Sequence, residues 1–260
     1  MKLSLAWAFL LQHIKTHLEY RVNFLISAGG TAVWQLACLL AVQVVLDRTT
    51  DLGGWSKHEI FLIYGVITLI MAVPRMFAFN LFFLGGQYIR PGTFDRLLVR
   101  PLNPLCHLLA DRFSPEGVGD FAVGVYIVAR AFGNLGIRPS PAMLLYLTLM
   151  VLSGAMVVIA INLFLSTTAF WTQDSAPLML AANHNTQMAR YPLTIYTKPI
   201  RIALTWVLPY GLISFYPAAH LLGRVTGWMA YASIPVAALL FAGAYRFWLF
   251  GLRHYTGTGS

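Results

Sequence analysis

The sequence predicts an all-α membrane protein with six transmembrane helices, and two observations support this prediction. Of the 260 residues, 58% are hydrophobic and only 10% are charged, whereas soluble domains usually contain about 25% charged residues. The hydrophobic residues also form long runs with few charges, and about 20 such residues are enough to cross a bilayer core. A soluble fold of this length could not bury so much apolar surface, so we expect the protein to lie in a membrane.

The N-terminal segment, residues 1–21, is predicted to be an amphipathic helix that lies in the membrane interface. Its apolar side chains recur with a helical period on one face, and its polar side chains recur on another, as is typical of interfacial helices. The two sets are Leu3, Trp7, Leu10, Ile14 and Leu18, and Ser4, Gln12, Lys15 and Glu19. At the other end, residues 256–260 are expected to be a flexible tail or a cloning scar.

Residues 22–255 are predicted to form a single six-span transmembrane domain. The expected spans cover residues 22–46, 60–84, 117–136, 141–166, 202–216 and 225–247. Pro209 and Pro217 argue against a straight fifth span, so we expect it to end near Tyr216 and to be followed by a partly re-entrant segment. Residues 172–200, with the polar run 183–185 inside them, are expected to form a solvated connection.

The distribution of basic residues predicts that both termini face the cytoplasm. With six spans and this orientation, twelve Lys and Arg residues fall inside and four fall outside, in agreement with the positive-inside rule. The inner set is Lys2, Lys15, Arg21, Arg90, Arg96, Arg100, Arg112, Arg190, Lys198, Arg201, Arg246 and Arg253, and the outer set is Arg48, Lys57, Arg138 and Arg224. The net charge of +9 is therefore attributed to contact with anionic lipid, and no nucleic-acid partner is expected.

Three charged residues fall inside the expected spans, where a charge costs about 3 kcal/mol or more. Arg75 and Asp120 lie on consecutive spans and toward the same side of the membrane, so we expect them to form an ion pair. Arg130 lies nearer the outer end. Its side chain either reaches to the interface or contributes to a path for an anionic substrate.

Motifs for catalysis, ATP binding and metal binding do not occur in the sequence. The chain has no G-x-x-x-x-G-K-[ST] phosphate loop, no H-E-x-x-H and no G-x-S-x-G. His13 and His17 stand four residues apart, but no carboxylate or Cys joins them, so we predict no metal site. Cys38 and Cys106 are expected at different depths, and therefore without a disulfide. We expect no catalytic residue and no cofactor bound by this chain itself.

Several local motifs occur in an order and spacing that extend over nearly the whole chain. They are residues 19–25 (EYRVNFL), 53–56 (GGWS), 88–105 (YIRPGTFDRLLVRPLNPL), 189–196 (ARYPLTIY) and 217–224 (PAAHLLGR). Together with the order of the spans, this set resembles the permease subunit of the type-2 ATP-binding-cassette exporters. Within that family it resembles the branch of bacterial export permeases that are often found as paired subunits.

This resemblance implies a division of labour between subunits. Two copies of a separate ATPase subunit, carrying ATP and Mg, would bind at the cytoplasmic face of the bacterial inner membrane. A second permease subunit, identical or homologous, would complete the substrate path. The cytoplasmic loop 87–116 would hold a coupling helix that docks into the ATPase. The residues implied for this coupling are Gly92, Phe94, Asp95, Arg96, Leu97 and Arg100.

Three other classes of protein stay open from the residues alone. An ion-coupled secondary transporter would often show inverted repeats and midplane carboxylates, and of these features only Asp120 is visible. An intramembrane enzyme would need a convergent nucleophile or metal set in its spans. A non-transporting membrane scaffold would need neither. Co-purification of an ATPase through residues 90–112 would separate these classes, whereas the sequence carries no signal for the transported substrate.

Overall fold

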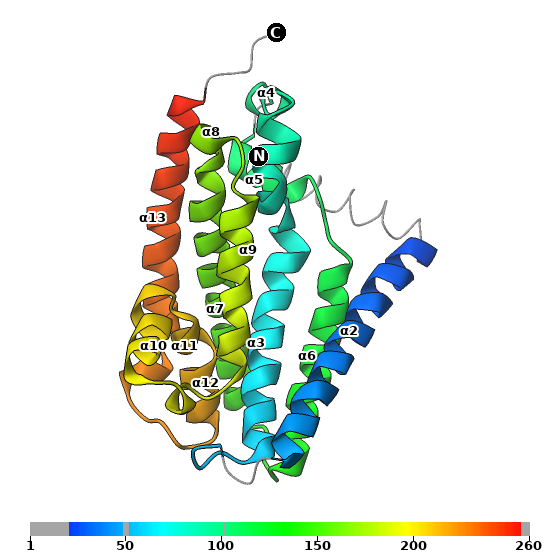
Figure 1. Cartoon of the computed structure of the whole chain (residues 1–260), viewed down its shortest axis with the longest axis vertical. Helices are drawn as coiled ribbons and strands as arrows, with labels where there is room; N and C mark the ends of the chain where they lie inside the picture. Colours follow the sequence, from blue (N-terminus) through cyan, green and yellow to red (C-terminus); the bar gives the residue numbers. More distant parts are fainter. Residues whose placement is uncertain (1–20, 49–51, 101, 256–260) are drawn as a thin grey trace.

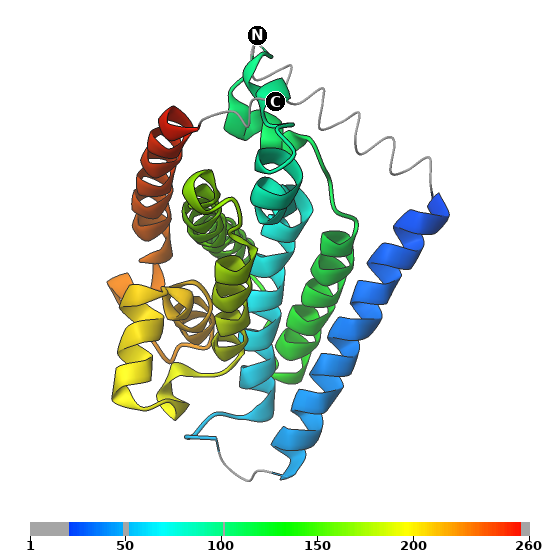
Figure 2. The ribbon, with the colours of Figure 1, turned by 45° about the horizontal axis from the view of Figure 1, so that its top comes forward.

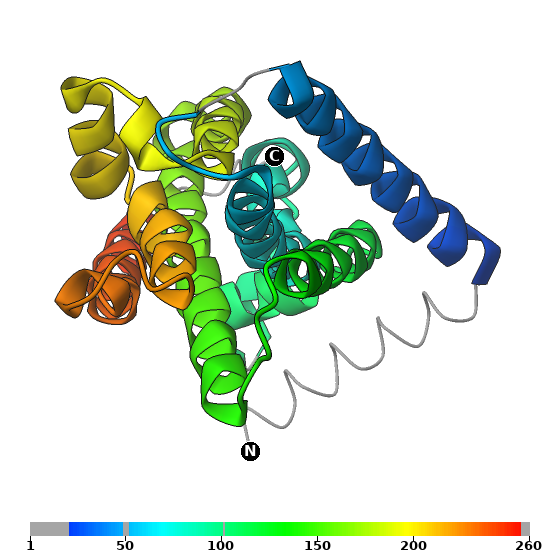
Figure 3. The same cartoon turned by 90° about the horizontal axis from the view of Figure 1, so that it is seen from below.

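The computed structural model describes residues 21–48, 52–100 and 102–255, and all regular secondary structure among them is helical. The predicted interfacial helix, apart from Arg21, and the predicted tail at 256–260 lie outside the described residues. Long helices run side by side along the molecule (Figure 1), and the view from below shows α3 (Lys57–Phe77) near the centre (Figure 3). Residues from Ile60 to Ile70 on this helix are almost all buried, so α3 is the core of the bundle.

Four more long helices surround α3. They are α2 (Arg21–Arg48), α6 (Glu116–Asn134), α7 (Pro141–Thr167) and α13 (Ser233–His254). Helix α3 packs against α6 and α7, α13 packs against α7, and α2 packs chiefly against α6. Helix α2 therefore lies at the edge of the bundle, with only Gln35, Val42 and Leu46 buried.

Four helices among the described residues are long and apolar enough to cross a membrane. They are α2, α3, α13 and the continuous stretch Pro141–Thr172; a bent pair of helices described below would bring the number to five. Helix α6 falls short, because Asp120 and Arg130 lower its mean hydropathy. These four or five candidate spans support a multi-pass membrane protein. Their number is lower than the six spans expected from the sequence.

Close approach of α6 to its neighbours depends on glycine. A Cβ atom added to Gly119 would lie 2.1 Å from the backbone oxygen of Ala28 on α2, and one added to Gly124 would lie 2.8 Å from the side chain of Leu69 on α3. Small residues at such crossings are the common way in which membrane helices pack tightly, because lipid supplies no hydrophobic driving force between them. Gly119 thus determines how closely α2 can lie against α6.

Beyond α3 the chain forms a cap at one end of the bundle. Pro74 lies in the last turns of α3, and after Phe77 the chain continues as η1 (Phe79–Phe83), a 3-10 helix, and η2 (Leu84–Ile89), a π-helix. The short helices α4 (Asp95–Leu98) and α5 (Pro104–Ala110) follow. They lie at the top of Figure 1, near the C-terminal end of α13.

The chain makes its fifth passage along the bundle at a position that differs from the prediction. After α8 (Ala169–Thr172) it returns through α9 (Ala176–Asn185) and η3 (Thr186–Arg190), with α9 packed on α7 and η3 packed on α3. Figures 1 and 2 show this segment running down beside α3. Residues 176–190 therefore pack along the bundle, and most of their polar side chains line a partly open cavity.

The next segment, residues 193–224, forms a hairpin, and its bent helix pair has the geometry of a broken span or of a re-entrant loop. Three contacts locate it. Thr194 accepts a hydrogen bond of 2.9 Å from Trp55, just before α3, and Arg224 pairs with Glu59, in the first turn of α3. Between them, Ile213 lies opposite Gly154, midway along α7. The chain thus enters and leaves this hairpin at the same end of the bundle and turns near its middle.

The hairpin contains a sharp bend within the span expected at 202–216. Its two arms are Lys198–Val207, made of α10 (Lys198–Ile202) and the π-helix η5 (Ala203–Val207), and Tyr210–Leu221, made of α11 (Tyr210–Ile213) and α12 (Phe215–Leu221). They meet at an angle of 73°. The bend falls at Pro209, ahead of Tyr216, because proline has no N–H to continue the helix. The segment between the arms of this hairpin and α13 contains η6 (Trp228–Ala230), and η4 (Leu193–Ile195) precedes the first arm.

The path of the chain also changes the side of the bundle on which some basic residues lie. Helix α10, which contains Lys198 and Arg201, lies in the half of the bundle opposite α4 (Figure 1). Arg190 lies beside Tyr64 within the bundle. The sequence predicts all three residues on the cytoplasmic side, in or directly after the connection expected at 172–200.

Candidate functional site

Arg75 and Asp120 lie in contact at the crossing of α3 and α6. Arg75 Nη1 is 3.0 Å from Asp120 Oδ2, and the Asp120 side chain is 1% exposed. On its other oxygen, Oδ1, Asp120 accepts a hydrogen bond of 3.0 Å from Gln35 Nε2 of α2. The hydroxyl of Tyr64 in turn donates to Gln35 Oε1 at 3.3 Å. One buried carboxylate thus joins three helices.

A second cation lies at the far end of this network. The guanidinium of Arg190, at the end of η3, stacks over the ring of Tyr64 at 4.8 Å. The sequence analysis paired Arg75 with Asp120 but missed Gln35 and Arg190. Gln35 had a visible signal, because it is an amide in the middle of the apolar run 22–46. Arg190 gave no such signal, because it stands in a polar stretch.

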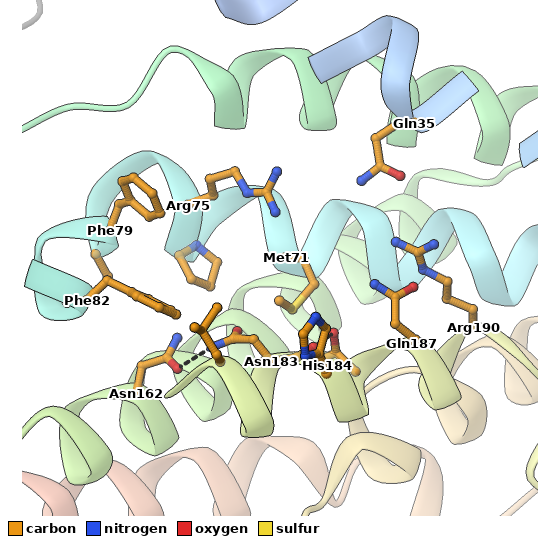
Figure 4. A pocket seen from close by; sticks show the side chains of 14 residues that line it. Gln35, Met71, Arg75, Phe79, Phe82, Asn162, Asn183, His184, Gln187 and Arg190 are labelled. Atoms are coloured by element: carbon orange, nitrogen blue, oxygen red, sulfur yellow. Dashed lines mark hydrogen bonds between the residues drawn. The ribbon is translucent and has the colours of Figure 1, made fainter. Parts of the chain in front are cut away.

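A cavity of about 420 Å³ opens beside these residues, between α2, α3, α7 and the α9–η3 segment. Its polar lining comprises Gln35, Arg75, Asn162, Asn183, His184, Thr186, Gln187 and Arg190, and its apolar lining comprises Met71, Pro74, Ala78, Phe79, Phe82 and Leu180. Figure 4 shows Phe79 and Phe82 at one end of this cavity and Gln187 and Arg190 at the other. None of these lining residues is acidic, so the cavity is amphipathic and cationic.

Arg130 is not part of this cavity. It stands ten residues after Asp120 on α6, which corresponds to about 15 Å along the helix, and it lines a separate hollow of about 200 Å³ with Lys57, His58 and Asn134. Lys57 forms an ion pair with Asp47. The two intramembrane sites predicted from the sequence are therefore separate places in the structure.

A third hollow, of about 690 Å³, is lined almost entirely by apolar side chains of α3, α6 and α7. Leu69, Phe121, Val125 and Leu152 are among its residues. It presents almost no polar group to a ligand. The polar cavity is the better candidate for a specific site.

The loop implied for coupling forms a short helix with two distinct faces. Helix α4 covers only Asp95–Leu98, and Gly92 precedes it with a φ of +69°, a conformation that favours glycine. Asp95, Arg96 and Arg100 are exposed, whereas Phe94 and Leu97 are 0% and 4% exposed. The outward apolar surface comes instead from Leu98 and Val99, which are 42% and 84% exposed.

Phe94 anchors this helix to the ends of two long elements. Its ring lies 5.4 Å from Phe170 of α8, 6.1 Å from Trp248 of α13 and 5.0 Å from Tyr255, which follows α13. Edge-to-face aromatic packing of this kind holds rings in defined positions. Phe94 and Leu97 therefore face the inside of this chain, whereas Asp95, Arg96 and Arg100 face outward, and the role of all five in coupling stays a prediction.

Polar contacts fix the rest of the same loop. Arg90 lies 3.3 Å from Asp174, Asn103 donates a hydrogen bond of 2.8 Å to the hydroxyl of Tyr245, and the hydroxyl of Tyr88 donates one of 2.7 Å to Asp111. Burial, and then the bond to Asp111, raise the pKa of Tyr88 well above its usual range. Tyr88 thus remains a hydrogen-bond donor at neutral pH, and the loop is held to α8 and α13.

The part of the chain that the structure describes contains no group of three or more His, Cys, Asp or Glu side chains placed to hold a metal ion. His13 and His17, the pair considered in the sequence, lie outside the described residues. The free cysteines Cys38 and Cys106 lie on α2 and α5.

Long apolar helices joined by a buried charge network, with an internal polar cavity, define a multi-pass membrane protein of the transporter class. Residues 32–259 match the family described as ABC-2 family transporter protein, and the chain belongs to that family. It is thus a permease of the ATP-binding-cassette exporter type, a membrane component that is not itself the ATPase. No curated protein and no solved structure shows significant similarity to the chain.

Proposed function

We propose that this chain is the permease subunit of an exporter that is driven by two copies of a separate ATPase subunit. ATP and Mg bind to that ATPase, and a second permease subunit, identical or homologous, completes the substrate path. The membership in the ABC-2 family supports this assembly. ATP binding and hydrolysis would then alternate the permease between two states through differential contacts with the ATPase.

The observation that carries the proposal is the two-sided construction of α4. Its outer face offers the charged side chains of Asp95 and Arg96 next to exposed Leu98 and Val99. Its inner face is fixed through Phe94 to α8 and α13. A force applied to the outer face would therefore move the ends of two membrane helices. This is the mechanical property that a coupling helix needs.

The end of the bundle that carries α4 is the cytoplasmic end in this proposal, and the membrane is the bacterial inner membrane. Arg90, Arg96, Arg100, Arg112, Arg246 and Arg253 gather in the elements at that end, as the positive-inside rule requires. With α9–η3 counted as a passage, the chain crosses the membrane six times, through α2, α3, α6, α7, α9–η3 and α13. Both termini then lie in the cytoplasm.

Replacement of Asp95 or Arg96 by Ala in the complete complex tests this function. We expect ATP hydrolysis to continue while transport falls, because the outer face of α4 loses its contacts with the ATPase. Arg138→Ala is a matched control, since Arg138 is exposed in the loop at the opposite end. Transport that remains fully coupled in both α4 variants would count against docking at this helix.

Co-purification separates this function from the alternatives. A scaffold or an ion-coupled transporter would be isolated without an ATPase, whereas the proposed exporter brings its ATPase with it through residues 90–112. A role of Arg130 in an anionic path stays a separate proposal, and full transport by an Arg130→Gln variant would exclude it.

A further inference from the structure

The charges around the cavity between α3 and α9–η3 do not balance. Two guanidinium groups, those of Arg75 and Arg190, line the cavity, and His184 lines it as well. The carboxylate at the cavity is Asp120, which is engaged by Arg75 and Gln35. Glu116 lies one turn before it on α6 but does not line the cavity. The second guanidinium, that of Arg190, rests on the face of Tyr64. At membrane depth an excess positive charge is costly, so an anion that enters the cavity would be stabilised there.

The cavity also offers neutral hydrogen-bond donors on the same side as Arg190. His184, Gln187 and Arg190 follow one another at spacings of three residues and line the cavity together. The amide of Asn183 lines it too, but it already donates to Asn162 and to the backbone oxygen of Met179. Amide and guanidinium N–H groups are the donors that bind phosphate and carboxylate oxygens.

The opposite end of the cavity is lined mainly by aromatic side chains, with Asn162 beside Phe82. Phe79 and Phe82 stand at that end in Figure 4, and Met71, Ala78 and Leu180 add aliphatic surface. The volume of about 420 Å³ falls within the range of about 300–1,000 Å³ that is usual for ligand sites. An inorganic anion would fill only the polar end and would leave the apolar end in contact with water.

We propose that this cavity binds an anionic amphiphile, a molecule with one phosphate or carboxylate headgroup and an apolar tail. The headgroup lies at Gln187 and Arg190 and is attracted by Arg75, which stands between them and the aromatic end, and the tail lies against Phe79 and Phe82. This proposal rests on the proposed function, because it names the substrate class of the same permease. Arg190 is a binding residue, and Asp120 is a positioning residue that holds Arg75 at the cavity wall.

Binding of dodecyl phosphate to the purified full-length chain tests the proposal, with native mass spectrometry and ligand-dependent thermal stabilisation as the measurements. Loss of one charge-assisted hydrogen bond corresponds to about 10- to 100-fold weaker binding. We expect a loss of this size in Arg190→Gln and a smaller one in Arg190→Lys. Arg246→Gln, which removes an exposed arginine on α13 far from the cavity, should bind as the unchanged chain does.

Two further ligands separate the contribution of the headgroup to binding from that of the tail. Dodecanol, which has the tail without the charge, and inorganic phosphate, which has the charge without the tail, should each bind at least tenfold more weakly than dodecyl phosphate. Equal binding of inorganic phosphate would overturn the proposal in favour of a free-anion site. Equal binding of dodecyl phosphate to the unchanged chain and to Arg190→Gln would overturn it altogether.

A variant that keeps the net charge separates an effect on ligand binding from an effect on folding. Arg75→Gln alone would leave Asp120 buried without its cation, so Arg75→Gln is combined with Asp120→Asn, which removes both charges. We expect this double variant to keep the fold and to bind dodecyl phosphate more weakly than the unchanged chain, and undiminished binding would contradict the place of Arg75 at the headgroup. These measurements need no ATPase, so a failure of anion binding is distinguishable from a failure of ATPase co-purification.

Discussion

At the scale of single residues, Asp120 has the largest structural role in the described part of the chain. Its two carboxylate oxygens connect Gln35 of α2 and Arg75 of α3 to α6, and its side chain is almost completely buried. Taking a carboxylate out of water is unfavourable unless cations and donors replace the lost hydration. The position of α2 and the charge of Arg75 are therefore linked through this one side chain.

The first prediction concerns this pair. Asp120→Asn and Arg75→Gln should each lower the thermal stability of the purified protein, by about 3 kcal/mol for a fully buried pair and by less here, because the Arg75 side chain is 37% exposed. The double variant should be more stable than the sum of the two single effects predicts. Strict additivity in this double-mutant cycle would show that the two residues do not interact.

The pairing of Arg75 with Asp120 could be predicted from the sequence because each is a rare charge in an apolar run and the two runs are consecutive. The similar depth of the two residues in consecutive spans was therefore enough to predict the ion pair. The partners Gln35 and Arg190 could not be predicted in the same way. A single amide in an apolar helix does not identify the helix it faces, and an arginine among polar residues resembles any residue of a solvated loop.

At the scale of elements, the contact of α2 with α6 depends on the absence of a side chain at Gly119. The second prediction is that Gly119→Ala destabilises the protein by about 1–3 kcal/mol, as overpacking does, because its Cβ would meet the backbone of Ala28. Gly133→Ala, on the same helix, has open space around the new Cβ and should be neutral or slightly stabilising. Thermal unfolding of the two variants in the same detergent compares them, and equal stability would contradict the close approach of α2.

The third prediction separates the two faces of α4. Replacement of Leu98 and Val99 by Asp should abolish binding of the ATPase and leave the bundle stable, because both side chains are exposed. Phe94→Ala should retain binding but lose coupled transport, because it empties the aromatic contact with α8 and α13; it should also cost about 3 kcal/mol of stability. Co-purification and transport measurements read out the two effects. Loss of ATPase binding in Phe94→Ala with a folded chain would contradict this division.

Helix starts were among the predictable features of the elements. Ser56 and Glu59 form a capping box at the start of α3, and Ser140 and Pro141 start α7, as the local sequence indicates. The passage through α9 and η3 was not predictable from hydropathy. Its polar face lines a cavity, so its composition matches that of a loop. The prolines of this segment predict that its helix is interrupted. How far the hairpin reaches along the bundle depends on its contacts with α3 and α7, which the sequence does not reveal.

At the scale of the whole molecule, the hairpin at residues 193–224 changes which loops lie on the same side. Glu59 holds Arg224 through two hydrogen bonds, of 2.6 and 2.8 Å, and the guanidinium of Arg224 also stacks on Trp55 at 4.4 Å. Trp55 holds Thr194 as well. The start of α3 thus fastens both ends of the hairpin, and the two ends must face the same compartment.

The fourth prediction tests this topology. In a variant with Cys38 and Cys106 replaced by Ser, a cysteine introduced at the exposed position of Thr197 or at that of Thr226 should react with an impermeant maleimide from outside the cell. The fifth span expected from the sequence at 202–216 would instead place residue 197 in the cytoplasm. Labelling of Thr197→Cys only after the membrane is opened would therefore contradict the hairpin.

The peripheral position of α2 has a kinetic consequence for the proposed ligand. This helix provides Gln35 to the cavity wall, yet it packs chiefly against α6 and buries few of its residues. Displacement of α2 alone would therefore expose the cavity sideways, toward the acyl chains, while α3 and α7 stay packed. An amphiphile dissolved in one leaflet would then arrive by two-dimensional diffusion, and its rate of arrival would depend on its surface density and on the fluidity of the lipid more than on its aqueous concentration.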